Sequence, residues 1–230
     1  VLIALVISFL IIFMVSEQPV EAIKYLLIGP LTSKRNMGNV VESMIPLIFT
    51  GTGVCIMFSA NQINLAGEGA FHVGGLIASC VAIHMTAKVV SPMVALVCAG
   101  IVGALFTAIP AVMKITTTAD ELVSSLMINY LALYFGNYML NNVIGDPKAS
   151  AASYKLTEQS KLPVLVNGTR VHLGIVIAIA VAVIGYIFLY RTKMGYELRL
   201  TGENEEFARY SGVSIVKVIL ISQLLGGFIA

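Results

Sequence analysis

Apolar positions along the chain gather into seven long runs that polar connections separate. Most runs approach the length of about 17–25 residues that a helix needs to cross the hydrocarbon core of a membrane. They predict spans at approximately Val1–Val15, Val41–Ala60, Ala70–His84, Pro92–Met113, Glu121–Leu140, Val171–Tyr190 and Ser214–Ala230. The pattern therefore predicts an all-α fold, a polytopic transmembrane helix bundle of about seven spans.

The first and last runs are interpreted as partial spans. Fifteen helical residues, the length of Val1–Val15, rise about 22 Å, which is less than a hydrocarbon core of about 30 Å. A signal peptide is the alternative for the first run, but no basic residue precedes it and Met14–Glu17 is a poor cleavage site. We therefore expect a sequence that is truncated at both ends.

Three polar connections join the predicted spans. Ser16–Val40 and Asn141–Arg170 are long, whereas Arg191–Val213 is compact and charged. None of them resembles a flexible Gly/Ser linker, so residues 1–230 are expected to form a single transmembrane domain. Four predicted spans separate the two long connections, which therefore lie on one side of the membrane. One further span places Arg191–Val213 on the other side. Basic residues are about equally dense on both sides, so the positive-inside rule does not orient the chain.

Composition supports a membrane protein and excludes several other classes. Hydrophobic residues make up 58% of the chain and charged residues 11%, with a mean hydropathy of +0.92. A soluble domain is about 45–50% apolar and about 25% charged, so soluble, disordered and nucleic-acid-binding classes are excluded. The net charge of +2 indicates no polyanionic partner. The cysteines and histidines lack metal-ligand spacing, and no catalytic motif is present, so neither a metal site nor an enzyme is indicated.

The most unusual polar stretch is Ser59–His72, between two apolar runs. It contains Asn64 and Glu68, and glycines flank the glutamate on both sides. Irregular backbone inside a membrane persists only against protein or a water-filled cavity, as in the broken helices of transporters. The same residues also fit an ordinary polar loop with Glu68 solvated at the membrane face. The residues leave both interpretations open.

A second polar cluster precedes and enters the Glu121–Leu140 span. Thr118 or Asp120 is expected to cap this helix, and Glu121 suits the positive end of the helix dipole. Asn129 lies about two turns inside the span and needs a hydrogen-bonding partner there. It could face a polar pathway or join neighbouring helices.

The charged connection Arg191–Val213 predicts a short amphipathic helix. Asn204 is the expected N-cap, Glu205 follows in the first turn, and Gly212 ends the helix. Phe207 and Tyr210 are three residues apart and give the helix an aromatic face. Helices that lie on membranes usually have a basic polar face, whereas this one is mostly acidic. The pattern therefore favours docking to a soluble partner.

Three stretches resemble motifs of permease subunits from bacterial ABC importers, in the branch of branched-chain amino acid, simple-sugar and nucleoside permeases. Asn64–Gly69 and Asp120–Tyr130 resemble blocks of the nucleoside and simple-sugar members. The charged connection resembles the cytoplasmic coupling segment of the branch, with shared positions at Arg191, Gly195, Arg199, Gly202, Asn204, Ala208, Tyr210 and Gly212. The three blocks occur in the family's order and spacing. Ala70 departs from a frequent glutamine, and Glu206 with Phe207 replaces a pair of small residues.

The resemblance implies a permease subunit, without enzymatic activity of its own, in a bacterial cytoplasmic membrane. It implies an ATP-driven importer that moves a small polar solute by alternating access, with a nucleoside favoured and a simple sugar next. The implied partners are cytoplasmic ATPase subunits that bind ATP and Mg²⁺, a second permease subunit and an extracytoplasmic solute-binding protein, so this chain needs no cofactor. The implied ATPase-coupling residues are Gly202, Asn204, Glu205, Ala208, Tyr210 and Gly212, which makes that connection cytoplasmic and Asn141–Arg170 external.

Asn64, Glu68 and Asn129 are the candidates for the substrate path. Amide side chains both donate and accept hydrogen bonds, which suits a neutral polar cargo. Two rival functions stay open from the residues alone. One is an ion-coupled secondary transporter in which Glu68 binds the coupling ion, and the other is a non-transporting membrane scaffold whose polar residues hold helices together.

Overall fold

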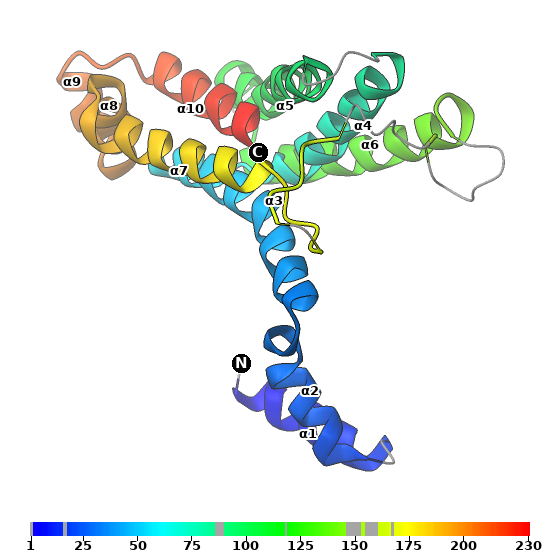
Figure 1. Cartoon of the computed structure of the whole chain (residues 1–230). Coiled ribbons are helices and arrows are strands. Elements are labelled where there is room, and N and C mark those ends of the chain that lie inside the picture. The colour runs from blue at the N-terminus through cyan, green and yellow to red at the C-terminus, as the bar shows by residue number, and fades with distance from the viewer. Residues whose placement is uncertain are drawn as a thin grey trace. The chain divides into compact units, whose positions relative to one another are not determined.

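The computed structural model describes residues 2–15, 18–85, 90–117, 119–145, 153–154, 161–166 and 168–230. Most of these residues are α-helical (Figure 1), as the apolar runs predict. In chain order the helices are α1 Leu2–Val15, α2 Pro19–Thr32, α3 Lys34–Ser59, α4 Gly67–His84, α5 Val90–Thr117, α6 Glu121–Asn142, α7 Gly174–Arg191, α8 Lys193–Glu203, α9 Glu205–Tyr210 and α10 Ile215–Ile229. Every predicted span therefore corresponds to a helix, and the all-α membrane bundle is confirmed.

The helices differ in how well they suit a full crossing of the membrane. Within the described ranges, α3, α5 and α7 are long and apolar enough to span, while Leu5–Val15 and Ile215–Ile229 are shorter apolar helices. α4 and α6 have the length of a span and carry more polar side chains. Two isolated β-bridges, Gly145 with Ser153 and Val164 with His172, lie in the long connection before α7. The total of seven spans stays a prediction.

The expectation of a polar connection over residues 16–40 is wrong for most of its length. α2 occupies Pro19–Thr32, and α3 begins at Lys34 instead of Val41. Pro19 suits the start of α2 because proline at the first helical position has a preset φ and its missing N–H bonds nothing there. Polar side chains such as Lys34 and Arg35 are exposed on α3. A helix pairs its own backbone groups, so exposed polar side chains do not prevent it from forming.

The chain divides into two compact units. The first contains Val1–Ile45 and Pro163–Ile175, and the second contains Pro46–Leu162 and Val176–Ala230. In the first unit α1 packs against α2, and Gly38 lies against Thr169, because a Cβ at position 38 would be 2.6 Å from the Thr169 Cβ. The single-domain organisation stays a prediction.

α5 is the central helix of the second unit and packs against α4, α6 and α10 (Figure 1). Its crossing with α10 is very close, because a Cβ at Gly103 would lie 2.4 Å from the Gly227 carbonyl oxygen. A Cβ at Gly100 would lie 2.8 Å from the Phe228 carbonyl oxygen. Small residues permit such backbone approach between helices in a membrane. The glycines therefore fix α10 against α5 and place its polar side chains in the interior.

Candidate functional site

The connection between α3 and α4, residues 60–66, crosses the interior of the second unit without forming a helix. We call it the α3–α4 segment. α3 ends at Ser59, and Asn61 has a φ of +54°, a left-handed conformation that asparagine tolerates better than most residues. Burial alternates along the segment: even-numbered residues are buried and odd-numbered residues are exposed. Extended backbone places successive side chains on opposite sides, so one row of the segment points into the bundle.

Asn64 lies at the centre of this buried row and joins three elements. Its Nδ2 donates to the Thr107 carbonyl oxygen of α5 at 3.0 Å and to Gln223 Oε1 of α10 at 2.8 Å. Its Oδ1 accepts from the backbone N–H of Ala66 at 2.8 Å. The Thr107 hydroxyl completes the cluster by donating to the Gln223 carbonyl oxygen at 2.8 Å. We call these three fully buried residues, Asn64, Thr107 and Gln223, the amide junction.

One polar group of the amide junction lacks a partner. Among the described residues, Gln223 Nε2 is buried and makes no hydrogen bond. An unsatisfied buried donor costs about 1–3 kcal/mol. A polar molecule in the junction that accepts a hydrogen bond from Gln223 Nε2 would therefore remove this cost.

α6 holds the other side of the α3–α4 segment through Asn129 and Ser125. Asn129 Nδ2 donates to the Leu65 carbonyl oxygen at 2.8 Å, and its Oδ1 accepts from the Gly69 N–H at 2.9 Å. Ser125 Oγ accepts from the Leu65 N–H at 3.1 Å. A Cβ at position 69 would lie 2.7 Å from Asn129 Oδ1, so glycine is required for this approach. These bonds satisfy backbone groups that the break between α3 and α4 frees.

Lys114 anchors the beginning of the α3–α4 segment. Its Nζ donates to Gln62 Oε1 and to Glu121 Oε2, the second at 3.2 Å. The Glu121 side chain is only 4% exposed, and its Oε1 has no hydrogen-bonding partner within the described part of the chain. A buried carboxylate costs desolvation free energy that only a well-placed cation and further hydrogen bonds repay. Lys114 of α5 therefore joins the segment to the start of α6.

The expected cap of α6 is present at Asp120, whose carboxylate accepts from the Leu122 N–H at 2.9 Å. Thr118, the alternative cap, lies outside the described residues. Glu121 lies in the first turn as expected, and it also pairs with Lys114, which the sequence did not indicate.

The three candidate path residues differ in their hydrogen bonds and in their exposure. Asn64 and Asn129 both bond to the backbone around the α3–α4 segment, one from inside the segment and the other from α6. Glu68 is exposed in the first turn of α4, where the helix dipole stabilises its charge. Both asparagines thus bond to this region, and the Glu68 side chain beside Gly69 is exposed.

Sequence reasoning missed Thr107, Lys114 and Gln223 as members of this site. Gln223 carries a signal that could have identified it, because it is an amide within the apolar run of α10 and a polar side chain in such a run needs a partner. Thr107 carries little signal, since threonine satisfies itself in helices by bonding the carbonyl four residues earlier.

The charged connection, residues 191–213, forms two helices where the sequence predicts one. The predicted helix is α9: Asn204 Oδ1 caps it by accepting from the Phe207 N–H at 3.0 Å, and Gly212 follows its end with a φ of +85°. α8 precedes it, and Thr192 caps α8 by accepting from the Gly195 N–H at 3.1 Å. Asn204 is thus both the end of α8 and the start of α9.

The charged connection packs directly against the α3–α4 segment. A Cβ at Gly202 would lie 2.3 Å from the Ser59 carbonyl oxygen and 3.3 Å from the Asn61 nitrogen. Leu198 of α8 is buried in a cluster with Ala60 and Val218. Ala208 of α9 is buried against α5 and α10. A displacement of α8 toward this contact must therefore move the first residues of the segment that carries Asn64.

α9 presents two aromatic side chains outward. Phe207 is 57% exposed and Tyr210 is 88% exposed, while Ala208 between them is buried. Glu205 and Arg209 are exposed as well and pair with each other at 3.1 Å. Large aromatic side chains at an exposed helical corner are typical of interaction sites.

Comparison with known proteins places the chain among transport permeases. The family model described as "Branched-chain amino acid transport system / permease component" matches residues 36–230. The chain is 31% identical to the guanosine ABC transporter permease protein NupP of Bacillus subtilis, over 84% of this chain and 57% of that protein. It is 29% identical to the glucose ABC transporter permease protein TsgB13 of Haloferax volcanii, over 100% of this chain and 64% of that protein.

A third relative is the nucleoside ABC transporter permease protein NupB of Lactococcus lactis, which is 25% identical over 100% of this chain and 67% of its own length. The chain spans less than two thirds of the length of NupP and of TsgB13. No solved structure gives a significant match.

Proposed function

Because the chain belongs to the family of branched-chain amino acid transport system permease components, we propose that the whole protein is the membrane-spanning permease of an ATP-driven ABC importer. The observation that carries the proposal is the contact of Gly202 of α8 with Ser59 at the end of α3 and with Asn61 of the α3–α4 segment. It joins a docking element for an ATPase to the polar backbone of a transport path. The permease itself hydrolyses nothing, because its partner ATPase binds ATP and Mg²⁺.

The proposed cargo is a small neutral polar solute, a nucleoside in the first place and a simple sugar in the second. NupP is named for guanosine, NupB for nucleosides and TsgB13 for glucose. Amide side chains such as Asn64, Gln223 and Asn129 both donate and accept hydrogen bonds, as the hydroxyl and base groups of such solutes require. Glu68 remains a further path candidate on the exposed start of α4.

In the proposed mechanism the amide junction is a closed part of the path. Asn64 donates both of its Nδ2 protons, to the Thr107 carbonyl oxygen and to Gln223 Oε1, so no donor of Asn64 is available to a solute in this arrangement. Separation of α10 from the α3–α4 segment would free the Asn64 and Gln223 amides together. A solute that replaces their mutual hydrogen bond would bind the open state better than the closed state, which is the differential affinity that a population shift requires.

In the proposed cycle, the ATPase acts on the permease through the charged connection. α9 is the proposed docking helix, with Phe207 and Tyr210 seated in the ATPase and the connection on the cytoplasmic side. Closure of the ATPase dimer moves α9, and α8 transmits the movement to Ser59 and Asn61 through the Gly202 contact. A second permease subunit and an extracytoplasmic solute-binding protein complete the proposed assembly.

A non-transporting scaffold is the second candidate. It is favoured by one observation, that Asn64 and Asn129 each bond to more than one element and so could serve only to join helices. Reconstitution distinguishes the two functions. Proteoliposomes that contain the permease, its ATPase and its binding protein should accumulate labelled guanosine or glucose only with ATP. No uptake by a correctly assembled complex would favour the scaffold, and uptake driven by an ion gradient without ATPase would favour a secondary transporter.

A further inference from the structure

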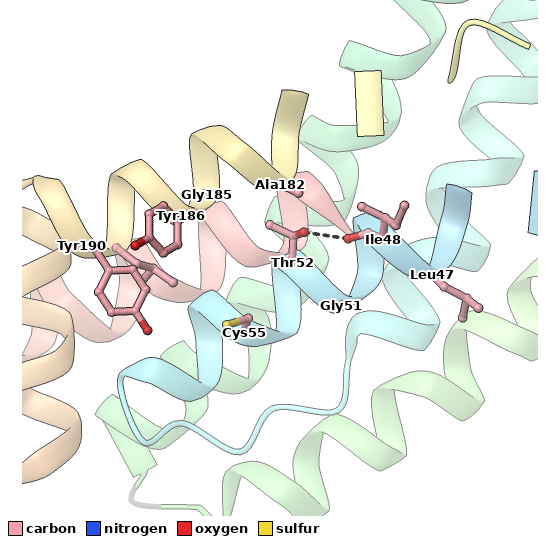
Figure 2. Close-up of a pocket in the computed structure, with 10 residues that line it drawn as sticks. Leu47, Ile48, Gly51, Thr52, Cys55, Ala182, Gly185, Tyr186 and Tyr190 are labelled. Atoms are coloured by element: carbon pink, nitrogen blue, oxygen red, sulfur yellow. Dashed lines mark hydrogen bonds between the residues drawn. The ribbon is translucent and has the colours of Figure 1, made fainter. Parts of the chain in front are cut away.

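A groove of about 360 Å³ runs between α3 and α7 in the second unit (Figure 2). Its walls run from Leu47 to Cys55 on α3 and from Ala182 to Tyr190 on α7. These eight steps along each helix correspond to a groove about 12 Å long. The Thr52 hydroxyl in its wall donates to the Ile48 carbonyl oxygen of the same helix at 2.7 Å, so this wall does not demand a polar occupant.

Two glycines determine the width of the groove. A Cβ at Gly185 would lie 2.8 Å from Thr52 Cγ2, so α7 approaches α3 closely at this point. A Cβ at Gly51 would meet no atom within 4 Å, and the position is exposed. The groove is therefore closed at its floor and open along the Gly51 side.

The two ends of the groove differ in charge. At the end where α7 finishes, the rings of Tyr186 and Tyr190 lie 4.9 Å apart, and Figure 2 shows both on the α7 wall. The Arg199 guanidinium lies 4.9 Å from the centre of the Tyr190 ring, and its Nε donates to the Leu189 carbonyl oxygen at 3.1 Å. Arg191, the residue after Tyr190, is exposed. Two arginines thus lie beside the aromatic end of an apolar groove.

Nearby acids do not neutralise these arginines. Glu197 is 3.8 Å from Lys193, on the same helix as Arg199. Within the described part of the chain, neither Arg191 nor Arg199 forms an ion pair with a carboxylate. The end of the groove therefore carries net positive charge and attracts an anionic group.

We propose that this groove binds an anionic phospholipid of the leaflet on the α8–α9 side, with an acyl chain between α3 and α7 and the phosphate on Arg191 and Arg199. Tyrosine side chains are enriched at the level of lipid headgroups, and basic pockets between membrane helices bind anionic headgroups. The Arg199 side chain is already oriented by the Leu189 carbonyl and the Tyr190 ring, so it loses little freedom on binding a phosphate. The site is separate from the amide junction and does not depend on the proposed function.

Native mass spectrometry of the full chain, purified with any partner subunits, tests this proposal with dioleoyl phosphatidylglycerol and dioleoyl phosphatidylcholine as probes. The unaltered protein should retain phosphatidylglycerol in preference to phosphatidylcholine. The double variant R191Q/R199Q should weaken phosphatidylglycerol binding about 25-fold, since each of the two cations near a headgroup contributes an effect of about fivefold. Gly51→Leu fills the groove and should reduce retention of both lipids.

Matched controls come from the same unit. Lys217→Gln removes an exposed cation of α10, and Gly75→Leu adds a side chain at an exposed glycine of α4 whose Cβ would also meet no atom within 4 Å. Both should leave retention unchanged. Unchanged phosphatidylglycerol binding in both R191Q/R199Q and Gly51→Leu would overturn the proposal, as would losses of equal size in the controls.

Cys55 provides an independent measurement because it is exposed and lines the groove. With Cys80 and Cys98 replaced by serine, benzophenone maleimide on Cys55 should cross-link to phospholipid in membranes that hold the assembled complex. A predominant cross-link to a second permease subunit would show that a protein helix occupies the groove, and the lipid proposal would then be wrong.

Discussion

Gly202 of α8 lies so close to Ser59, the last residue of α3, that a Cβ at position 202 would be 2.3 Å from the Ser59 carbonyl oxygen. No side chain fits in that space without moving one of the two backbones. Ser59 lies one residue before the α3–α4 segment, and Gly202 lies three residues before the start of α9. The contact therefore provides a packing route from the α8–α9 connection to the segment that carries Asn64.

Gly202→Ala tests this route. Alanine stabilises an isolated helix relative to glycine by about 0.5–1 kcal/mol, so a loss is attributable to the contact with Ser59. Overpacking costs about 1–3 kcal/mol, and we expect α8 to shift and ATP-dependent uptake to fall at least fivefold while the ATPase still co-purifies. Gly75→Ala is the matched control, because its Cβ would meet no atom within 4 Å. Full uptake by Gly202→Ala would contradict a role of this contact in coupling.

Asn129→Leu removes both side-chain bonds that α6 makes to the Leu65 carbonyl and the Gly69 N–H. Each backbone group left unsatisfied costs about 1–3 kcal/mol, so we expect a lower melting temperature in detergent and a larger fractional loss of uptake. Asn142→Leu is the control, since the Asn142 amide donates to the Tyr138 carbonyl oxygen of its own helix. Equal fractional losses of assembly and uptake would assign Asn129 to helix packing alone.

Asn64→Leu and Gln223→Leu should have unequal effects although the two side chains share one hydrogen bond. Loss of Asn64 deprives Thr107, Ala66 and Gln223 of a partner, so about 3 kcal/mol of stability should be lost. Loss of Gln223 removes that one bond together with the unsatisfied Nε2, so the net cost should be about 1 kcal/mol.

A double-mutant cycle, measured from the free energy of unfolding in detergent, separates the contributions of the two side chains from that of their contact. The Asn64 and Gln223 substitutions should couple by about 1 kcal/mol, as expected for residues in one hydrogen-bond network. Additive effects would show that their contact contributes nothing, and the closed junction would then need another explanation.

Lys114→Met should destabilise the protein by about 3 kcal/mol or more, because it leaves the Glu121 carboxylate buried without its cation. Lys114→Met combined with Glu121→Leu should recover most of this loss, since the double variant buries no unpaired charge. Lys193→Met is the control: its partner Glu197 lies 3.8 Å away and the lysine is 92% exposed, so no measurable change is expected. Failure of the double variant to recover stability would mean that Lys114 acts mainly through Gln62.

How much of this structure follows from sequence differs between elements. The apolar runs predict α3, α5 and α7 because hydrocarbon allows only self-paired backbone. The same reasoning misses α2, which is too short for a span, and α8, whose sequence is too polar for one. Both still form helices that pair their own backbone groups. Asn204 could be predicted as a cap because capping is local, with acceptor and donor three residues apart.

For the candidate site, the sequence indicates individual residues but not the partners that they bond to. Asn64 and Asn129 attract notice because they interrupt or enter apolar runs. Their partners could not be predicted, since the Asn64 amide bonds to residues 43 and 159 positions away and those pairings depend on how α5 and α10 cross. The exposure of Glu68 is one of the two alternatives that the residues leave open, and no local pattern decides between them.

α9 is the proposed docking helix for the ATPase. Phe207→Ser combined with Tyr210→Ser removes the two exposed aromatic side chains without touching the buried Ala208 or the Asn204 cap. We expect the variant to reach the membrane in normal amount, because neither ring contributes to a buried cluster, and to lose co-purification of the ATPase, because aromatic anchors supply a large share of interface affinity. Tyr134→Ser is the control, since Tyr134 of α6 is 70% exposed and lies outside the charged connection. An unchanged yield of ATPase with the double variant would show that α9 is not the docking helix.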